Sequence, residues 1–223
     1  MEKALGDFRK GGAILVDPVV TGLNLVETQN DASEAKYARA AAINAYLARL
    51  PATAPIRNID EMVAKGGDLV KPAIIEAAKT QNQWLERNPN FVAMKKHQTV
   101  LRAALIALMD KYELDALVYP YRTGVASDFS DKPAPPGTGG GDAAGANNLH
   151  SFTGLPSMIV PGGFYPSDGM PFGLQLLARP FDEATLIKVG SGYEAVSKNR
   201  KSPASTPPLK GEHFEYAAPL NNT

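Results

Sequence analysis

The sequence contains no cysteine, which excludes disulfide frameworks, thiolate metal sites and cysteine nucleophiles together. It also lacks an excess of charge, because 23 Lys and Arg residues balance 23 Asp and Glu residues. Without a strong field of one sign, neither nucleic acid nor an anionic membrane is an expected partner. No apolar run approaches the roughly 18 residues of a membrane-spanning helix, and charges occupy the first residues where a signal peptide would be apolar. We therefore expect a soluble, cytoplasmic protein.

Several signatures of catalysis are absent as well. A glycine run after residue 136 contains a GxGxxA pattern from Gly139, but the prolines of residues 133–136 prevent the strand that a dinucleotide site needs before it. No GxSxG elbow announces a serine nucleophile. The histidines His97, His150 and His213 share no metal-ligand spacing, so we expect no metal site and no cofactor. Among them His150 is the most interesting, because it lies in a turn directly before a buried strand.

What is present is an ordinary globular chain of 223 residues, 44% of them hydrophobic. Apolar spacing, caps and Gly or Pro breaks predict helices and strands that alternate. The expected helices span residues 2–10, about 30–50, 59–64, 72–80, 88–112 and 182–197, and the expected strands span 13–16, 116–119, 157–160 and 171–178. The sequence thus predicts an α/β fold in which strand 116–119 is an interior strand of a covered sheet.

The helix over residues 88–112 has the clearest pattern. Its apolar residues recur at three- and four-residue spacing and should pack on a sheet: Val100, Leu101, Ala104, Leu105, Leu108, Met109 and Tyr112. The strand after this helix leads into an irregular segment, residues 121–146, whose length is typical of a functional or disordered loop. We expect residues 1–197 to form one α/β domain containing this loop, and residues 198–223 to form a polar, proline-bearing tail.

Four segments, in order along the chain, resemble the C-terminal half of amidase signature hydrolases. The most specific is 147–178, in which a Thr-Gly-Leu-Pro turn, a Val-Pro-Gly-Gly break and a Gly-Leu-Gln-Leu-Leu strand follow one another at the family's spacing. The other three are a Gly-Ala-Ile-Leu-Val-Asp-Pro segment (12–18), an Asn-Ala-Tyr-Leu-Ala helix (44–48) and a Leu-Asp-Ala-Leu-Val-Tyr-Pro strand (114–120).

This resemblance implies the C-terminal portion of the amidase signature fold, a mixed sheet covered by helices, and hydrolysis of C–N bonds in amides. The family's nucleophilic serine, cis-serine and lysine belong to its N-terminal half, around a GGSSGG signature. This sequence contains no Ser-Ser dipeptide, so no residue carries over as catalytic. We expect the chain to be inactive unless an N-terminal half completes it, or to associate with itself through the apolar surface that such a half would cover.

The resemblance also places a wall of the substrate pocket on this chain. The loop after the 114–120 strand and the turn before the Thr-Gly-Leu-Pro motif line the family's acyl pocket. The candidate residues for binding a small-molecule amide are Tyr119, Tyr121, Arg122, Asp142, Asn147 and His150. The alternative is a non-catalytic binding or interaction module that keeps this pocket wall.

Overall fold

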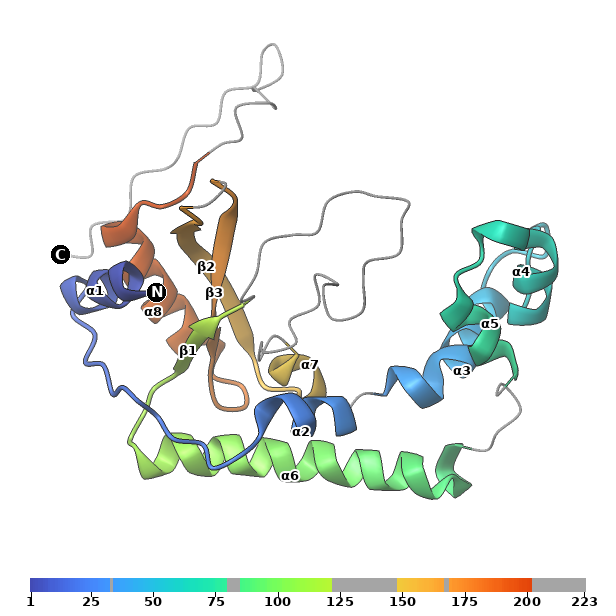
Figure 1. Cartoon of the computed structure of the whole chain (residues 1–223), viewed down its shortest axis with the longest axis horizontal. Helices are drawn as coiled ribbons and strands as arrows, with labels where there is room; N and C mark the ends of the chain where they lie inside the picture. Colours follow the sequence, from blue (N-terminus) through green and yellow to red (C-terminus); the bar gives the residue numbers. More distant parts are fainter. Residues whose placement is uncertain (33, 80–84, 122–147, 167–168, 202–223) are drawn as a thin grey trace, which may run out of the picture.

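The computed structural model describes residues 1–32, 34–79, 85–121, 148–166 and 169–201 (Figure 1). Three parts of the chain that the sequence analysis discussed lie wholly or mostly outside the described residues: the predicted 121–146 loop, residues 167–168, and the predicted tail after Lys201. The described chain combines helices with one small sheet and so confirms the α/β class. Its main helices are α1 (Glu2–Lys10), α2 (Leu25–Asp31), α3 (Ala35–Ala48), α4 (Ile59–Gly66), α5 (Pro72–Lys79), α6 (Pro89–Lys111), α7 (Leu149–Thr153) and α8 (Glu183–Ser197).

The sheet has three described strands, β1 (Leu117–Pro120), β2 (Ser157–Phe164) and β3 (Pro171–Leu177), in the order β1-β3-β2. Both neighbouring pairs are antiparallel, and β2 and β3 form a hairpin. The register places Gln175 at the centre, opposite Tyr119 on one side and Ile159 on the other. Because side chains alternate across a strand, these three residues share one face of the sheet.

Helices cover both faces of the sheet (Figure 1). On one face α1 and α8 form the α1/α8 cluster with Val160, Leu174 and Leu176, and the Phe8 and Tyr193 rings stack there with centroids 4.3 Å apart. On the other face α6 and α7 form the α6/α7 cluster: Leu101, Leu105, Leu149, Leu155 and Leu177. This arrangement confirms the expectation that the long helix packs on a sheet.

Helix α6 follows its predicted boundaries closely. Asn88 caps it, its side-chain oxygen accepting from the backbone N–H groups of Asn90 and Phe91, and Pro89 occupies the first turn, where its missing N–H costs nothing. Leu101 is fully buried, as its place in the apolar stripe predicts. Val100, predicted in the same stripe, is 55% exposed, because the sheet is narrow and covers only part of a wide stripe.

The Thr-Gly-Leu-Pro motif ends α7 and starts β2. Thr153 is buried, its hydroxyl donates to the Leu149 carbonyl at 2.6 Å, and its own carbonyl accepts from Arg102 of α6 at 2.6 Å. Gly154 adopts φ +63°, the left-handed conformation that a glycine tolerates best at a helix end. The motif therefore turns the chain sharply while α6 holds the turn in place.

Close packing against Phe172 explains the glycine in the middle of the Pro-Gly-Gly segment. It does not end the strand, as the sequence suggested, but lies inside β2 at a register shift between Pro161 and Gly163. A Cβ on Gly162 would lie 2.4 Å from the Phe172 ring, so only glycine fits there without moving the ring.

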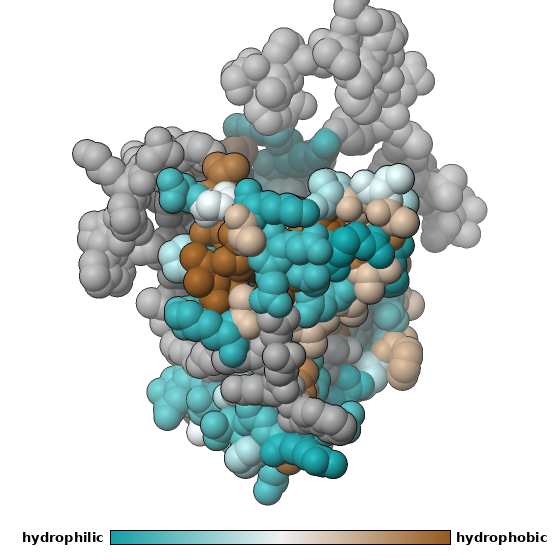
Figure 2. All heavy atoms as spheres, turned by 90° about the vertical axis from the view of Figure 1, so that its right-hand side faces the viewer, coloured by the Kyte–Doolittle hydropathy of each residue, from teal (hydrophilic) through white to brown (hydrophobic). Residues whose placement is uncertain are grey.

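Helices α3, α4 and α5 pack against one another at the end of the molecule where α6 begins (Figure 1). Asn58 caps α4 by accepting from the Glu61 N–H at 2.9 Å, and Asn44 of α3 accepts from the Ile59 N–H at 2.8 Å. Figure 2 faces this end and shows a largely hydrophilic surface with hydrophobic areas within it. Leu69, beside α4, is 93% exposed.

Two expectations about single elements were wrong. Residues 13–16 are not paired as a strand in the described part of the chain. Strand β1 lies at an edge of the described sheet and not in its interior. Both errors concern strand partners, which local apolar patterns do not specify. The helix predicted over about residues 30–50 is present as α3, and α2, which precedes it, was not predicted. None of the described helices combines the length and apolarity needed to cross a bilayer.

Candidate polar site on the sheet face

Three of the six predicted wall residues fall within the described residues, and they lie on one face of the sheet. Tyr119 and Tyr121 follow each other along the β1 edge, the Tyr121 N–H donating to the Gly173 carbonyl at 2.9 Å. His150, the second residue of α7, lies on the same face, where its side chain contacts Gln175 of β3. Arg122, Asp142 and Asn147 lie outside the described residues.

Gln175 is the centre of this polar site. It is fully buried on β3, opposite Tyr119, and its Nε2 lies 2.7 Å from Nδ1 of His150. Gln175 is the glutamine of the Gly-Leu-Gln-Leu-Leu motif, but it is not among the six residues predicted to line the substrate pocket. A polar residue at an inward position of an otherwise apolar strand was the available signal, since buried polar groups need partners and often mark sites.

The contacts of His150 indicate which ring nitrogen carries the proton when the imidazole is neutral. An amide nitrogen can only donate, so Nδ1 of His150 accepts from Gln175 and the ring proton sits on Nε2. That proton points to the Ser151 hydroxyl oxygen, 3.1 Å away. With this tautomer Nε2 donates to Ser151 and does not accept its proton, which is not the arrangement of an activated nucleophile and base.

Among the described residues, two buried polar atoms of the site have no hydrogen-bond partner: the Tyr119 hydroxyl and the Gln175 carbonyl oxygen. Burial raises the pKa of Tyr119 far above its ordinary value, so this phenol stays protonated and can donate a hydrogen bond. An unpaired buried polar group costs about 1 to 3 kcal/mol. The pair presents one donor and one acceptor, which suits a polar ligand group or a polar partner.

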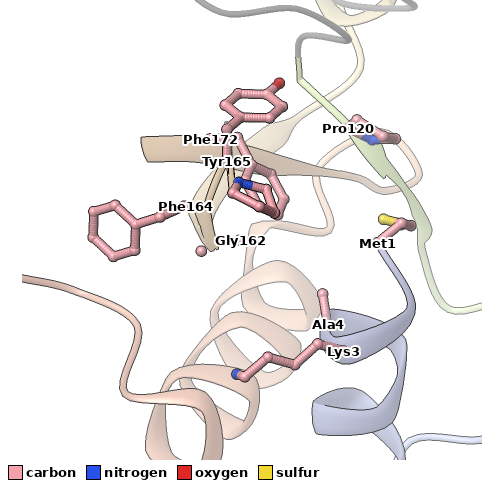
Figure 3. Close-up of a pocket in the computed structure, with 10 residues that line it drawn as sticks. Met1, Lys3, Ala4, Pro120, Gly162, Phe164, Tyr165 and Phe172 are labelled. Atoms are coloured by element: carbon pink, nitrogen blue, oxygen red, sulfur yellow. The ribbon is translucent and has the colours of Figure 1, made fainter. Parts of the chain in front are cut away.

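The opposite face of the sheet holds a separate cavity of about 470 Å³ (Figure 3). It lies between the start of α1 and the ends of the strands, with Met1 and Ala4 on one side and Phe164, Tyr165 and Phe172 on the other. Its lining is mainly apolar and aromatic, and Lys3 is the one charged side chain among the described lining residues. None of the three described wall residues, Tyr119, Tyr121 and His150, lines it.

Within the described part of the chain, no group of three or more His, Asp or Glu residues is placed to hold a metal ion. His97 is 48% exposed at its side chain and lies 3.9 Å from an Asp31 carboxylate oxygen.

Gly190 of α8 allows close packing, since a Cβ there would lie 2.5 Å from the Met158 sulfur.

Comparison with known proteins gives one family. The family model described as Amidase matches residues 9–187, most of the chain. Among curated proteins, the A subunit of the glutamyl-tRNA(Gln) amidotransferase of Chloroflexus aggregans is 55% identical over 47 residues, which are 21% of this chain and 9% of that protein. The corresponding protein of Levilactobacillus brevis is 43% identical over 63 residues, 28% of this chain and 12% of that protein.

Solved structures show the same fold. An amidase family protein from Bacillus anthracis superposes with a TM-score of 0.66 at 22% identity, covering 90% of this chain and 35% of that one. The native peptide amidase of Stenotrophomonas maltophilia superposes with a TM-score of 0.66 at 22% identity, covering 90% of this chain and 39% of that one. The chain thus spans about a third to two fifths of the solved structures that it matches.

Proposed function

Because the chain belongs to the amidase signature family, we propose that it supplies the substrate-side portion of an enzyme that hydrolyses C–N bonds in amides. Its substrate is a small-molecule amide. The serine nucleophile, the cis-serine and the lysine that the family uses come from a second portion bearing the GGSS signature, on the same or another chain. Without that portion, the chain does not turn over amides.

This proposal depends on a contrast: the family match covers most of the chain, but the described site has no activated nucleophile. The match spans residues 9–187, yet the sequence has no Ser-Ser dipeptide, and the one described serine in contact with a histidine of the site, Ser151, faces a donating Nε2. A chain with the family's scaffold and no activated nucleophile fits a role in binding and not in bond cleavage.

In this role the wall residues orient the substrate. The proposed wall comprises Tyr119, Tyr121, Arg122, Asp142, Asn147 and His150, and the geometry adds Gln175 to it. The protonated Tyr119 hydroxyl and the Gln175 carbonyl oxygen suit the carbonyl oxygen and the N–H of an amide, respectively.

The amidotransferase relatives are, by their names, subunits of an assembly. That supports work in a complex but leaves the amide unspecified, since the shared segment is 9% of the Chloroflexus aggregans protein.

The test is an assay of this chain alone and together with a catalytic portion. The purified chain is incubated with simple aryl amides, with and without the Stenotrophomonas maltophilia peptide amidase portion that precedes the region matched here. We expect no turnover by the chain alone and turnover by the combination above that of the added portion alone. Turnover by the isolated chain that persists through purification would contradict the proposal.

A second candidate is a non-catalytic binding module, and the 470 Å³ cavity favours it, because a concave site with a mainly apolar and aromatic lining is typical of small-molecule binding. The behaviour of the isolated chain separates the two. A monomer that unfolds in one cooperative transition favours the module, whereas aggregation that an added catalytic portion relieves favours the amidase.

A further inference from the structure

Three hydrogen-bonded side chains connect the buried centre of the sheet to the surface of the molecule. Gln175 is fully buried on β3, His150 of α7 is half-buried, and Ser151 is exposed. The Gln175 Nε2 lies 2.7 Å from Nδ1 of His150, and Nε2 of His150 lies 3.1 Å from the Ser151 hydroxyl oxygen. We call these three side chains the His150 relay.

The His150 relay has a direction. Because the amide nitrogen of Gln175 can only donate, His150 accepts at Nδ1 and donates from Nε2 to the Ser151 hydroxyl oxygen. A serine hydroxyl carries one hydrogen, and in this arrangement His150 does not use it. Among the described residues, Ser151 has no other hydrogen-bond partner. Its hydroxyl hydrogen is therefore available to donate outward.

Rotation of the Gln175 amide would reverse this direction. Its two N–H groups would then occupy the buried place where its carbonyl oxygen now has no described partner. Buried backbone N–H groups without an acceptor are rarer in proteins than carbonyl oxygens without a donor, and the same preference applies to a buried amide side chain. The orientation in which Gln175 donates to His150 is therefore favoured.

Helix α7 holds the outer part of the relay in place. Leu149 and Thr153 lie one turn apart and are buried, which fixes the inner side of this short helix. His150 and Ser151 therefore lie on its other sides. The Thr153 carbonyl also accepts from Arg102 of α6 at 2.6 Å. A donor on a helix anchored in this way is already oriented before a ligand arrives, which favours recognition.

Apolar packing does not explain a glutamine at the inner end of the relay. Its neighbours along β3, Leu174 and Leu176, are buried leucines. Burial of an amide whose carbonyl oxygen has no described partner costs stability that a leucine would not lose. What Gln175 supplies and a leucine would not is the N–H that sets the direction of the His150 relay.

We propose that Ser151 determines specificity by donating a hydrogen bond to a second carbonyl oxygen of the amide substrate, and that Gln175 acts through His150 as a positioning residue for this donor. The inference rests on the proposed function, in which the Tyr119 hydroxyl and the Gln175 carbonyl oxygen bind the scissile amide. Ser151 adds a further donor one imidazole ring away from Gln175, so it suits an acceptor other than that amide. The substrate class is therefore an amide whose acyl group carries a second carbonyl.

The kinetic test combines this complete chain with the Stenotrophomonas maltophilia portion used in the assay above. The substrates are levulinoyl and pentanoyl anilides, which differ only by a carbonyl in place of one methylene. Dividing kcat/KM for the first by kcat/KM for the second cancels any loss common to both amides. Ser151→Ala should lower this ratio about three- to tenfold, the effect of one hydrogen bond, and Ser151→Thr should restore it.

Ser191→Ala is the matched control. Ser191 is also an exposed helical serine, but its helix α8 packs on the opposite face of the sheet, so the ratio should stay unchanged. Ser151 and Ser191 are both exposed, so alanine should leave the fold intact, and the thermal midpoint of each variant checks this.

A double-mutant cycle tests the positioning role. Gln175→Met keeps a side chain of similar volume and removes the N–H donor. It should lower the ratio in the parent but not further in Ser151→Ala, because it acts through the same hydroxyl. Equal losses in both backgrounds would show a general structural effect and contradict the positioning role of Gln175.

Nuclear magnetic resonance of histidine rings labelled with nitrogen-15 reads the relay in the isolated chain. His150→Gln identifies the His150 signals, and the pH is set where the imidazole is neutral. We expect the proton on Nε2 in the parent and a mixture of both tautomers in Gln175→Met. A proton on Nδ1 in the parent would overturn the direction of the relay.

The outcomes separate this inference from the function beneath it. If the parent combination hydrolyses both anilides and Ser151→Ala leaves the ratio unchanged, the inference is wrong and the proposed function stands. If the parent combination hydrolyses neither anilide, the proposed function fails and the inference fails with it.

Discussion

Replacing Leu101 by alanine should cost this protein a large part of its stability, whereas the same replacement at the preceding residue should not. Leu101 is fully buried in the α6/α7 cluster, where it meets the sheet through Leu177. Val100 is 55% exposed on the same helix. The two substitutions therefore compare a core contact with a surface position at nearly the same place in α6.

The magnitude follows from burial and cavity formation. A Leu→Ala change at a fully buried site loses the transfer free energy of the removed groups and leaves a cavity, about 2 to 5 kcal/mol in all. The upper half of that range applies if the rigid sheet and helix cannot close around the gap. Val100→Ala removes little buried surface and gains a few tenths of a kcal/mol in helix propensity, so its effect should stay within about 0.5 kcal/mol.

Urea unfolding followed by circular dichroism measures both variants. A loss of this size should lower the midpoint of Leu101→Ala strongly without changing the slope, while Val100→Ala keeps the midpoint of the parent. Equal shifts for the two variants, or a loss below about 1 kcal/mol for Leu101→Ala, would refute the placement of α6 against the sheet. A changed slope would instead indicate that unfolding is not two-state.

Three further changes test other contacts. Tyr119→Phe removes a buried hydroxyl that has no partner among the described residues, so stability near pH 7 should stay equal or rise by up to about 1 kcal/mol. Because burial raises the pKa of Tyr119 above its value in the unfolded chain, titration of this phenol leaves stability unchanged below about pH 10 and lowers it as the pH rises toward the folded-state pKa. Tyr119→Phe should lessen this alkaline loss in unfolding curves at several pH values. Asn58→Ala removes the α4 cap to Glu61 and should cost about 1 kcal/mol in urea unfolding, and an unchanged midpoint would argue against the cap. Arg179→Met removes the contacts of the guanidinium with Asp110 at 2.8 and 3.0 Å and its hydrogen bond to the Leu114 carbonyl at 2.6 Å. The ion pair should account for about 1 kcal/mol or less, and this part of the loss should shrink in 1 M salt. A loss wholly independent of salt would assign the effect to the Leu114 hydrogen bond or to packing.

Elements with a local cause were predictable from the sequence. Helix α6 carries its cap at Asn88, a first-turn proline and a long apolar stripe, so its existence and both ends follow from nearby residues. Helix α1 likewise ends at Gly11, where a glycine pair follows the last helical residue. Strand β1 was also located, but its edge position depends on which other strands exist, and no local pattern contains that information.

The candidate site also contains residues that the sequence predicted and one that only the structure identified. The family motifs pointed to Tyr119, Tyr121 and His150, and the structure gathers all three on one sheet face. Their roles in substrate binding remain a prediction. Gln175 was missed because its importance comes from register: only the antiparallel pairing sets it opposite Tyr119 and within 2.7 Å of His150.

By itself, the sequence determined the class of fold, most of the helices and the family, because caps, apolar periods and motif spacing act over a few residues. The absence of a cysteine and of a Ser-Ser dipeptide was equally plain in it. Within the part of the chain that the structure describes, only the tertiary structure decided which strand lies at an edge, which side of the α6 stripe is buried and which polar atoms lack partners. Those properties depend on contacts across the core between residues far apart in the chain. The local sequence around either residue does not specify its partner.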